Sequence, residues 1–154
     1  MSDTLTLQCR RLPAGADPHP IPLPSAQSAG AAGIDLRAAL RAPLTLGPGE
    51  RVRVPTGWAM ALPQGTEGQI RPRSGNAWRM GLTCLNSPGT LDADYRGPVE
   101  VLLVNHGDAP ITLVRGDRIA QLVVTAVGAV TSVAVETLDA TDRGAGGFGH
   151  TGRQ

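Results

Sequence analysis

The stretch 83–105 collects several side chains that could do chemistry around a glycine-bounded turn. It contains the amide of Asn86, the carboxyls of Asp92 and Asp94, and Tyr95, which is the only tyrosine. An amide can read the hydrogen-bonding groups of a ligand, and a carboxylate of ordinary pKa can orient a water molecule for attack. A tyrosine in a turn, outside any apolar run, favours stacking on a ligand. The alternative is an Asp-rich turn whose carboxyls cap their own backbone amides.

A second group of residues could bind phosphate. Arg73, Ser74 and Gly75 follow a strand-like run and offer a guanidinium fork, a hydroxyl and a backbone that a ligand can approach closely. Each of these groups binds phosphate well, especially at the start of a helix. The pattern Pro-Arg-Ser-Gly is short and occurs by chance, so an ordinary loop is the alternative.

The segment 143–152 has the composition of a closing lid. Amides of glycines such as Gly147, together with Arg143, could meet phosphate oxygens, while Thr151 offers a hydroxyl and Phe148 could cover a planar base. The segment lacks the G-x-x-x-x-G-K-[ST] pattern of a Walker loop. With five glycines in ten residues it cannot form a stable element alone, so we expect an arm that is mobile without ligand. Disorder without function is the alternative.

Two polar residues lie inside strand-like runs. Asp35 and Arg37 share one face of the run 29–39, where a solvated ion pair on an edge strand and a functional acid are both open interpretations. Gln121 stands between two apolar residues after a charged turn. A buried amide must be hydrogen-bonded, so Gln121 is the residue that an ordinary turn does not explain.

Short runs of β-forming residues between turn signals predict an all-β domain. Their spacing suits a compact, barrel-like domain of jelly-roll type, and only Ser74 to Met80 could form a short helix. Proline makes residues 10–32 an extended surface arm. The expected strands are 5–7, one within 29–39, 44–46, 51–54, 58–62, one ending at 71, 83–85, 99–104, 111–113, 119–125 and 131–135.

The composition excludes several classes of protein. A chain of 154 residues with 41% hydrophobic content forms one domain with a real core. A formal net charge of +1 gives no bulk field for nucleic acid, so small anions are the better partners. Cys9 and Cys84 form no metal-binding pattern and favour free thiols in a reducing compartment. Without an apolar run long enough for a bilayer, we expect a soluble, cytoplasmic protein with no membrane partner.

Five segments resemble, in the same order, the motifs of the trimeric deoxyuridine triphosphate nucleotidohydrolases (dUTPases). They are AGIDLRA at 32–38, PRSG at 72–75, TCLNSPGTLDADYRGPVEVLLVN at 83–105, RGDRIAQL at 115–122 and RGAGGFGHTG at 143–152. Together they span nearly the whole chain, and five motifs in order are far more specific than any one. The residues NAWRM at 76–80 depart from the family's usual small-residue, Lys, His pattern.

The resemblance implies hydrolysis of dUTP to dUMP and pyrophosphate, which limits uracil in DNA and supplies dUMP for thymidylate synthesis. Asp92 would orient the water that attacks the α-phosphorus, and Gln121 would help to hold that water. Mg²⁺ would be the cofactor, held mainly by the three phosphates, with Asp35 acting on it through water. Mg²⁺, Arg73 and Arg143 would neutralise charge and supply most of the acceleration.

The resemblance also implies contacts that select the nucleotide. The hairpin backbone and Asn86 would read the edge of uracil, because cytosine exchanges an acceptor for a donor there. Leu91 and Asp92 would meet the 3′-hydroxyl, and Tyr95 would occupy the space of a ribose 2′-hydroxyl. Thr90 belongs to the same substrate-binding stretch.

For the whole chain, the resemblance implies a domain over 1–138 and an arm over 139–154 in a homotrimer that shares its active sites. Two other functions are alternatives. The related dCTP deaminases need a glutamate where this chain carries Leu102, although Glu100 lies close by. A non-catalytic nucleotide sensor would keep the arginines and lose the acid at Asp92.

Overall fold

Alternation of buried and outward-facing side chains accounts for several strands of this computed structural model, which describes residues 5–13 and 19–147. In β5 (Thr66–Arg71), every second side chain is buried, and β7 (Gly89–Leu91) and β9 (Ile111–Leu113) are buried at both ends and exposed in the middle. Successive side chains of a strand point to opposite faces. Each of these strands therefore has one face on a core and one face outward.

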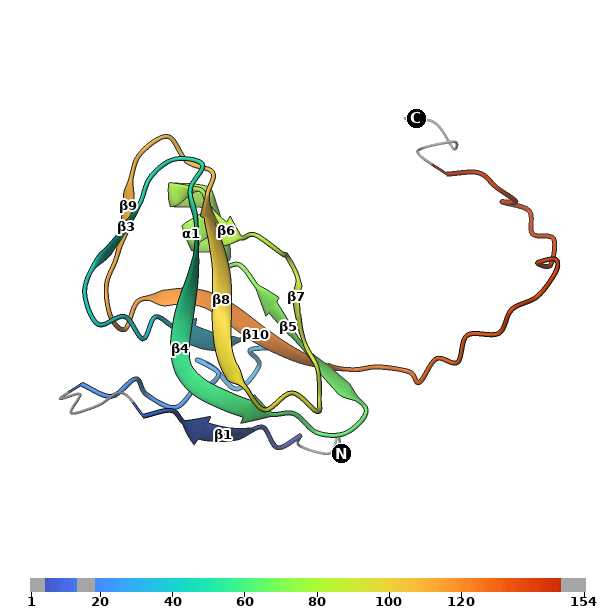
Figure 1. The fold of residues 1–154 in the computed structure, drawn as a ribbon, viewed down its shortest axis with the longest axis horizontal. Coiled ribbons are helices and arrows are strands. Elements are labelled where there is room, and N and C mark those ends of the chain that lie inside the picture. Colours follow the sequence, from blue (N-terminus) through green and yellow to red (C-terminus); the bar gives the residue numbers. More distant parts are fainter. Residues whose placement is uncertain (1–4, 14–18, 148–154) are drawn as a thin grey trace.

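Within the described residues, the strands form two four-stranded sheets and one two-stranded sheet (Figure 1). In spatial order the first sheet contains β1 (Gln8–Arg11), β4 (Arg51–Ala61), β8 (Pro98–Asn105) and β6 (Leu82–Cys84). The second sheet contains β2 (Ile34–Arg37), β10 (Arg118–Ala126), β5 and β7, and the third contains β3 (Leu44–Leu46) and β9. Every pairing is antiparallel. The predicted all-β, jelly-roll type of fold is confirmed.

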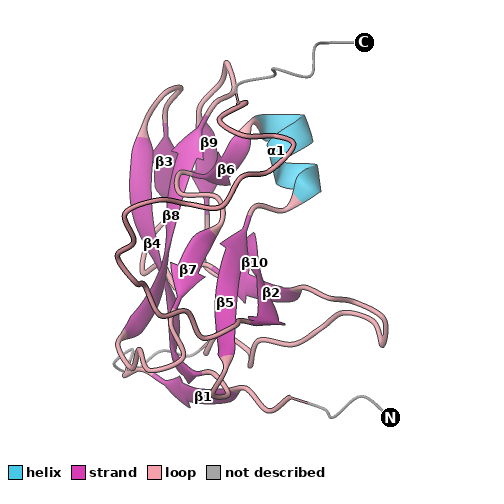
Figure 2. Ribbon diagram, turned by 90° about the vertical axis from the view of Figure 1, so that its right-hand side faces the viewer, coloured by secondary structure: helices cyan, strands magenta, loops and turns pink. Residues whose placement is uncertain are grey.

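The core lies between the two larger sheets (Figure 2). Leu36 of β2 and Leu122 of β10 contribute from one sheet, and Val54 of β4 and Leu103 of β8 contribute from the other; all four side chains are fully buried. Because aromatic residues make up only 3% of the chain, aliphatic side chains supply most of the buried apolar surface. The apolar faces of these strands thus fix which face of each sheet is turned outward.

The helix α1 (Ser74–Met80) has the bounds that the sequence predicts. Arg73 precedes it in an extended conformation, and Gly81 ends it in the left-handed region with φ 69°. The backbone N–H of Gly81 points to the carbonyls of Asn76 and Ala77, which satisfies acceptors that a helix end leaves open. Within the described ranges, no helix is long and apolar enough to cross a membrane.

Three predictions for the N-terminal half of the chain are wrong. The first strand lies at Gln8–Arg11 instead of 5–7, because its partner residues on β4 are 58–61. The two strands expected at 51–54 and 58–62 are one strand, β4, and the residues between them form a bulge, where Gly57 has φ 79° and the register to β8 shifts. Pairing with β8 on one side and β1 on the other keeps the strand continuous. Arg10 and Arg11 belong to β1 and not to the expected arm.

The prediction of a last strand at 131–135 is also wrong. Residues 127–147 contain no strand and lead away from the body of the molecule (Figure 1). A run of β-branched residues forms a strand only beside a partner, and no described strand pairs with this run. The charged turn at 115–118 does connect two strands, but these do not form a hairpin: β9 pairs with β3, and β10 pairs with β2 and β5.

The buried thiol of Cys84 predicts a loss of stability at alkaline pH. Burial raises its pKa from 9.0 to about 11. Below pH 9 the thiol is protonated in both the folded and the unfolded chain. Between pH 9 and 11 the unfolded chain releases the proton first, so the free energy of unfolding should fall as pH rises. Denaturant unfolding at several pH values measures this slope, and Cys84→Ala should make it flatter; equal slopes would contradict the prediction.

Candidate active site

The predicted hairpin exists, with β6 and β8 as its two strands. Leu82 lies opposite Asn105, and Cys84 lies opposite Leu103, and each strand differs from its predicted bounds by one residue at each end. Between them the chain leaves this sheet, because β7 pairs with β5 of the other sheet. The turn at 92–97 therefore returns the chain from the second sheet to the first.

The segment that leaves the first sheet, pairs with β5 and returns lines a cavity, which we call the hairpin pocket. Its volume is about 380 Å³. Five predicted substrate or catalytic residues line it: Asn86, Thr90, Leu91, Asp92 and Tyr95. The structure therefore brings together every predicted site residue of the hairpin, and it does so through the pairing of β7 with β5.

Glycines allow the side chains in the hairpin pocket to lie close to the backbone. A Cβ atom on Gly97 would lie 2.3 Å from the Tyr95 hydroxyl, and one on Gly89 would lie 3.0 Å from the Asn86 amide nitrogen. The Tyr95 hydroxyl donates a hydrogen bond to the Pro98 carbonyl at 3.2 Å, and the residue remains 43% exposed. The side chain is thus held in place at the edge of the pocket and remains accessible to a ligand.

Sequence reasoning missed part of this pocket. Arg53 and Glu100 line it and form an ion pair at 3.1 Å, and Leu102 lines it as well. Arg53 lies directly opposite Leu102, so these side chains share a face, and Glu100 is two residues away on that face. Alternation along β8 predicts that Glu100 and Leu102 share a face. Only the pairing of β4 with β8 shows that Arg53 lies on that face as well.

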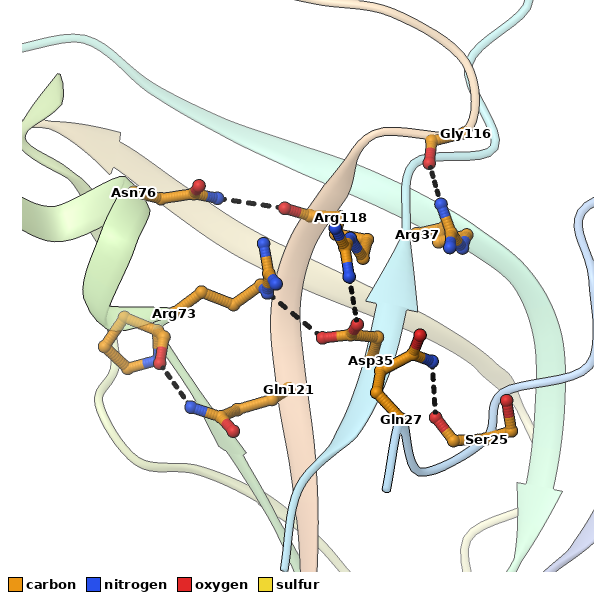
Figure 3. A network of polar contacts seen from close by, with 10 residues as sticks. Ser25, Gln27, Asp35, Arg37, Arg73, Asn76, Gly116, Arg118 and Gln121 are labelled. Carbon is orange, nitrogen blue, oxygen red and sulfur yellow. Dashed lines mark hydrogen bonds and ion pairs between the residues drawn. The ribbon is translucent and has the colours of Figure 1, made fainter. Parts of the chain in front are cut away.

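A second cluster, which we call the Asp35 network, connects β2, β10 and α1 (Figure 3). The Nε of Arg73 lies 3.0 Å from one carboxyl oxygen of Asp35, and a guanidinium nitrogen of Arg118 lies 3.2 Å from the other. The Asn76 amide donates to the Arg118 carbonyl at 2.9 Å, which ties α1 to β10. Arg118 and Asn76 had no predicted role. Asp35 is on an edge strand, as expected, but it is not paired with Arg37, whose guanidinium donates to Gly116.

Gln121 lies beside this network. Its side-chain amide donates to the Pro72 carbonyl at 2.9 Å, directly before Arg73 (Figure 3). Its amide oxygen fills the space above Gly33, where an added Cβ atom would lie 2.2 Å away. The amide is thus hydrogen-bonded, as its position in an apolar strand required. The bare backbone of Gly33 is what gives this side chain its room.

The predicted phosphate residues fall into two places. Arg73, Ser74 and Gly75 lie at the end of β5 and in the first turn of α1, next to the Asp35 network. Arg143 donates to the Gly146 carbonyl at 2.9 Å within the segment that leads away from the body, and Gly147 ends the same segment. The remaining arm residues, Phe148 and Thr151, lie outside the described residues.

The hairpin pocket and the Asp35 network remain separate within one chain. Asp92 lines the pocket, whereas neither Arg73 nor Gln121 does. β5 connects them, since Ile70 lines the pocket and the next residue, Arg71, lies opposite Gln121. One chain thus carries two half-sites with different chemistry, a pocket with a carboxylate and a loop with guanidinium groups.

The donor set suits a metal held mostly by a ligand. Among the described residues, no three His, Cys, Asp or Glu side chains gather to hold an ion. Both carboxyl oxygens of Asp35 already contact arginines. Mg²⁺ commonly keeps several waters and uses one or two carboxylates together with substrate phosphates. Contact of Asp35 with such an ion through water is compatible with this arrangement.

The fold and the two half-sites define a small jelly-roll protein with a carboxylate-edged pocket and an arginine-rich loop, and comparison with known proteins identifies the family. The family model described as dUTPase matches residues 19–152. A deoxyuridine 5′-triphosphate nucleotidohydrolase of Methylocella silvestris is 55% identical over 154 residues, covering 99% of this chain and 94% of that protein. The chain belongs to the dUTPase family.

Solved structures support the fold. A mutant dUTPase of Staphylococcus bacteriophage 80alpha with dUpNHpp superposes with a TM-score of 0.84 at 23% identity, covering 96% of this chain and 99% of that one. A mutant dUTPase from phage phi11 of S. aureus, described with a structural Mg(II) ion, has a TM-score of 0.74 at 23% identity, covering 86% and 97%. The jelly-roll architecture is therefore shared despite low identity.

Proposed function

We propose that this chain is a dUTP diphosphatase, which hydrolyses dUTP to dUMP and pyrophosphate and so limits uracil in DNA while supplying dUMP. The observation that carries the proposal is that Asn86, Thr90, Leu91, Asp92 and Tyr95 line one pocket. Family membership and a relative named for this activity support it. A cytoplasmic location belongs to the proposal, since the free thiols of the chain suit a reducing compartment.

Asp92 is the proposed catalytic residue. Its carboxyl would accept a hydrogen bond from a water molecule and aim that water at the α-phosphorus. Gln121 would hold the same water from the phosphate side. Its amide nitrogen donates to the Pro72 carbonyl, and its amide oxygen accepts no hydrogen bond from the described residues, so the oxygen is available to the water. Positioning is the main contribution of both side chains, as phosphoryl transfer leaves a protein little covalent chemistry.

Arg73, Ser74 and Gly75 would bind the phosphate chain. Planar guanidinium groups match phosphate oxygens in charge and geometry, and the hydroxyl and amides add hydrogen bonds. Arg143, Gly147, Phe148 and Thr151 of the arm would close over the bound nucleotide. Mg²⁺, held by the phosphates and through water by Asp35, would supply charge neutralisation.

Selection of the nucleotide is assigned to the hairpin pocket. Asn86 and the backbone would pair with the edge of uracil and would leave buried groups unpaired with cytosine. Tyr95, held by its hydrogen bond to Pro98, would exclude a ribose 2′-hydroxyl by steric contact. Leu102 lines the pocket where the related deaminases need a glutamate, and the nearby Glu100 is engaged by Arg53. These contacts disfavour deamination.

A homotrimer with shared sites completes the proposal. The half-sites stay apart in one chain, so a neighbouring chain would supply the loop with Arg73 to the pocket with Asp92. The apolar residues Val130, Val133 and Leu138 are at least 76% exposed in the segment that leads away from the body. Exposed apolar surface of this kind favours contact with another chain.

The decisive experiment compares dUTP, dCTP, dTTP and UTP with Mg²⁺ and measures pyrophosphate and ammonia. The proposal expects pyrophosphate from dUTP with at least about 100-fold preference over the other three, because a site built for one hydrogen-bond pattern rejects another. Ammonia from dCTP would instead identify a deaminase. Tight binding of dUTP without turnover would identify a nucleotide sensor.

Gly33→Ala should lower the rate of dUTP hydrolysis at little cost in stability. The new methyl group would overlap the Gln121 amide oxygen, 2.2 Å away, and a flexible side-chain end can move aside. Displacement of the Gln121 amide breaks its hydrogen bond to the Pro72 carbonyl and removes one of the two side chains proposed to position the water. We expect kcat to fall roughly 10-fold or more, as one hydrogen bond to a reacting group is lost. Steady-state kinetics and thermal unfolding measure the two effects.

Gly30→Ala is the matched control for this substitution. No described atom lies within 4 Å of the position of its Cβ atom, so both kcat and the melting temperature should stay unchanged. Similar losses of activity in the two variants would show that Gln121 is not the cause.

A further inference from the structure

The outward face of the second sheet carries a continuous polar row next to the phosphate loop. On β10, Gln121 lies directly opposite Asp35 of β2 on one side and Arg71 of β5 on the other. Residues directly opposite each other in antiparallel strands point to the same face. Arg71 therefore shares its face with both residues. Arg73, which pairs with Asp35, reaches this face as well.

The side chain of Arg71 is held in place along β5. Its guanidinium donates to the Gln69 amide oxygen through Nε at 3.1 Å and through a second nitrogen. The Gln69 amide in turn donates to Glu67 at 2.7 Å. These three residues alternate along the strand and so lie on one face. The result is a ladder of side chains that fixes the direction of an exposed arginine.

Among the described residues, Arg71 forms no ion pair, whereas Arg73 and Arg118 do. Arg73 and Arg118 share the carboxylate of Asp35. Among the described residues, Arg71 contacts only a neutral amide. A guanidinium that is held by two hydrogen bonds to Gln69, forms no ion pair among the described residues and lies on the same face as Gln121 and Asp35 is well prepared for a second anionic partner.

We propose that Arg71 is a further substrate-binding residue that contacts the phosphate chain from the β5 side, while Gln69 positions it. This proposal rests on the proposed function, since the anion is the phosphate chain of the nucleotide. Arg73 and Arg71 would bind the chain together, and the ladder would reduce the entropy that Arg71 loses on binding.

The test measures binding of inorganic pyrophosphate and of deoxyuridine by calorimetry, with Mg²⁺, to the wild-type chain and to Arg71→Gln. Loss of one charged hydrogen-bonding group should weaken pyrophosphate binding roughly 10- to 100-fold. Deoxyuridine has no phosphate, so its affinity should not change. Arg71→Lys keeps the charge but loses the planar guanidinium group. Its affinity for pyrophosphate should therefore lie between those of the wild type and Arg71→Gln. Gln69→Ala keeps the arginine and should weaken pyrophosphate binding less than Arg71→Gln.

Two results would overturn the inference: unchanged pyrophosphate binding in Arg71→Gln, or an equal loss for pyrophosphate and deoxyuridine, which would indicate a structural role. Turnover of dUTP by the wild-type chain separates the two proposals. If the wild type hydrolyses dUTP and Arg71→Gln binds pyrophosphate normally, only the role of Arg71 fails. If the wild type neither hydrolyses dUTP nor binds pyrophosphate, both proposals fail.

Discussion

Asp92→Asn should lower kcat for dUTP by roughly 10²- to 10⁴-fold, the range typical for loss of a general base. The amide has the same shape but accepts a hydrogen bond from water more weakly than a carboxylate does. Asp92 is exposed within the chain, and its backbone carbonyl, which accepts from the Tyr95 N–H at 3.2 Å, is unaffected. Folding and affinity for a non-hydrolysable nucleotide should therefore stay near wild type. Single-turnover kinetics measure the chemical step directly.

Asp94→Asn is the matched control, because Asp94 is a neighbouring exposed carboxyl that does not line the hairpin pocket. It should retain nearly full activity. Equal losses in the two variants would point to the net charge of the turn instead of an oriented water, and the assignment of Asp92 would then be wrong.

Mixing two inactive variants extends the same test to the sharing of sites. Asp92→Asn and Arg73→Gln should each be inactive alone. If a site takes Asp92 from one chain and Arg73 from the next, the co-refolded mixture should recover about one quarter of wild-type activity at equal ratio. No recovery would indicate that both residues act within one chain.

Gly81→Ala should have the largest effect on stability. Gly81 has φ 69°, and an added Cβ atom would lie 2.3 Å from the backbone nitrogen of Gly107 and 2.8 Å from the carbonyl carbon of His106. The left-handed conformation alone costs about 1–2 kcal/mol for a residue with a side chain. Because backbone atoms cannot move aside cheaply, we expect a total loss of about 3 kcal/mol or more. The Gly81 carbonyl also accepts from His106 at 2.9 Å, and this bond should weaken.

Gly49→Ala separates the two contributions to that loss. Gly49 also has positive φ, 77°, but none of the described atoms lies within 4 Å of its Cβ position. It should lose only the conformational part, about 1–2 kcal/mol. Thermal unfolding at equal protein concentration should give a melting temperature for Gly81→Ala that is lower by about 2–4 °C per additional kcal/mol. Equal melting temperatures would show that the contact with the 106–107 backbone is unimportant.

Features that depend on a few neighbouring residues could be predicted from the sequence. The bounds of α1 follow from the glycine that ends it, and β3 and β9 follow from short apolar alternation. The five hairpin residues of the pocket were also predictable, since they lie within ten positions of one another in the chain. Local sequence was misleading at Pro55-Thr56-Gly57, where turn-forming residues occupy a bulge. There the buried Thr56 hydroxyl donates to the Val99 carbonyl at 2.7 Å and holds the strand in the sheet.

The sequence by itself determined the type of fold, the family and the residues that could do chemistry, because strand alternation, turn residues and motifs are local properties. Only the tertiary structure decided how distant residues combine. It paired Arg53 with Glu100 in the pocket, placed two arginines on Asp35, and put Arg71 in one row with Gln121. Register between strands depends on which apolar faces pack into the common core, and that is a property of the folded chain as a whole.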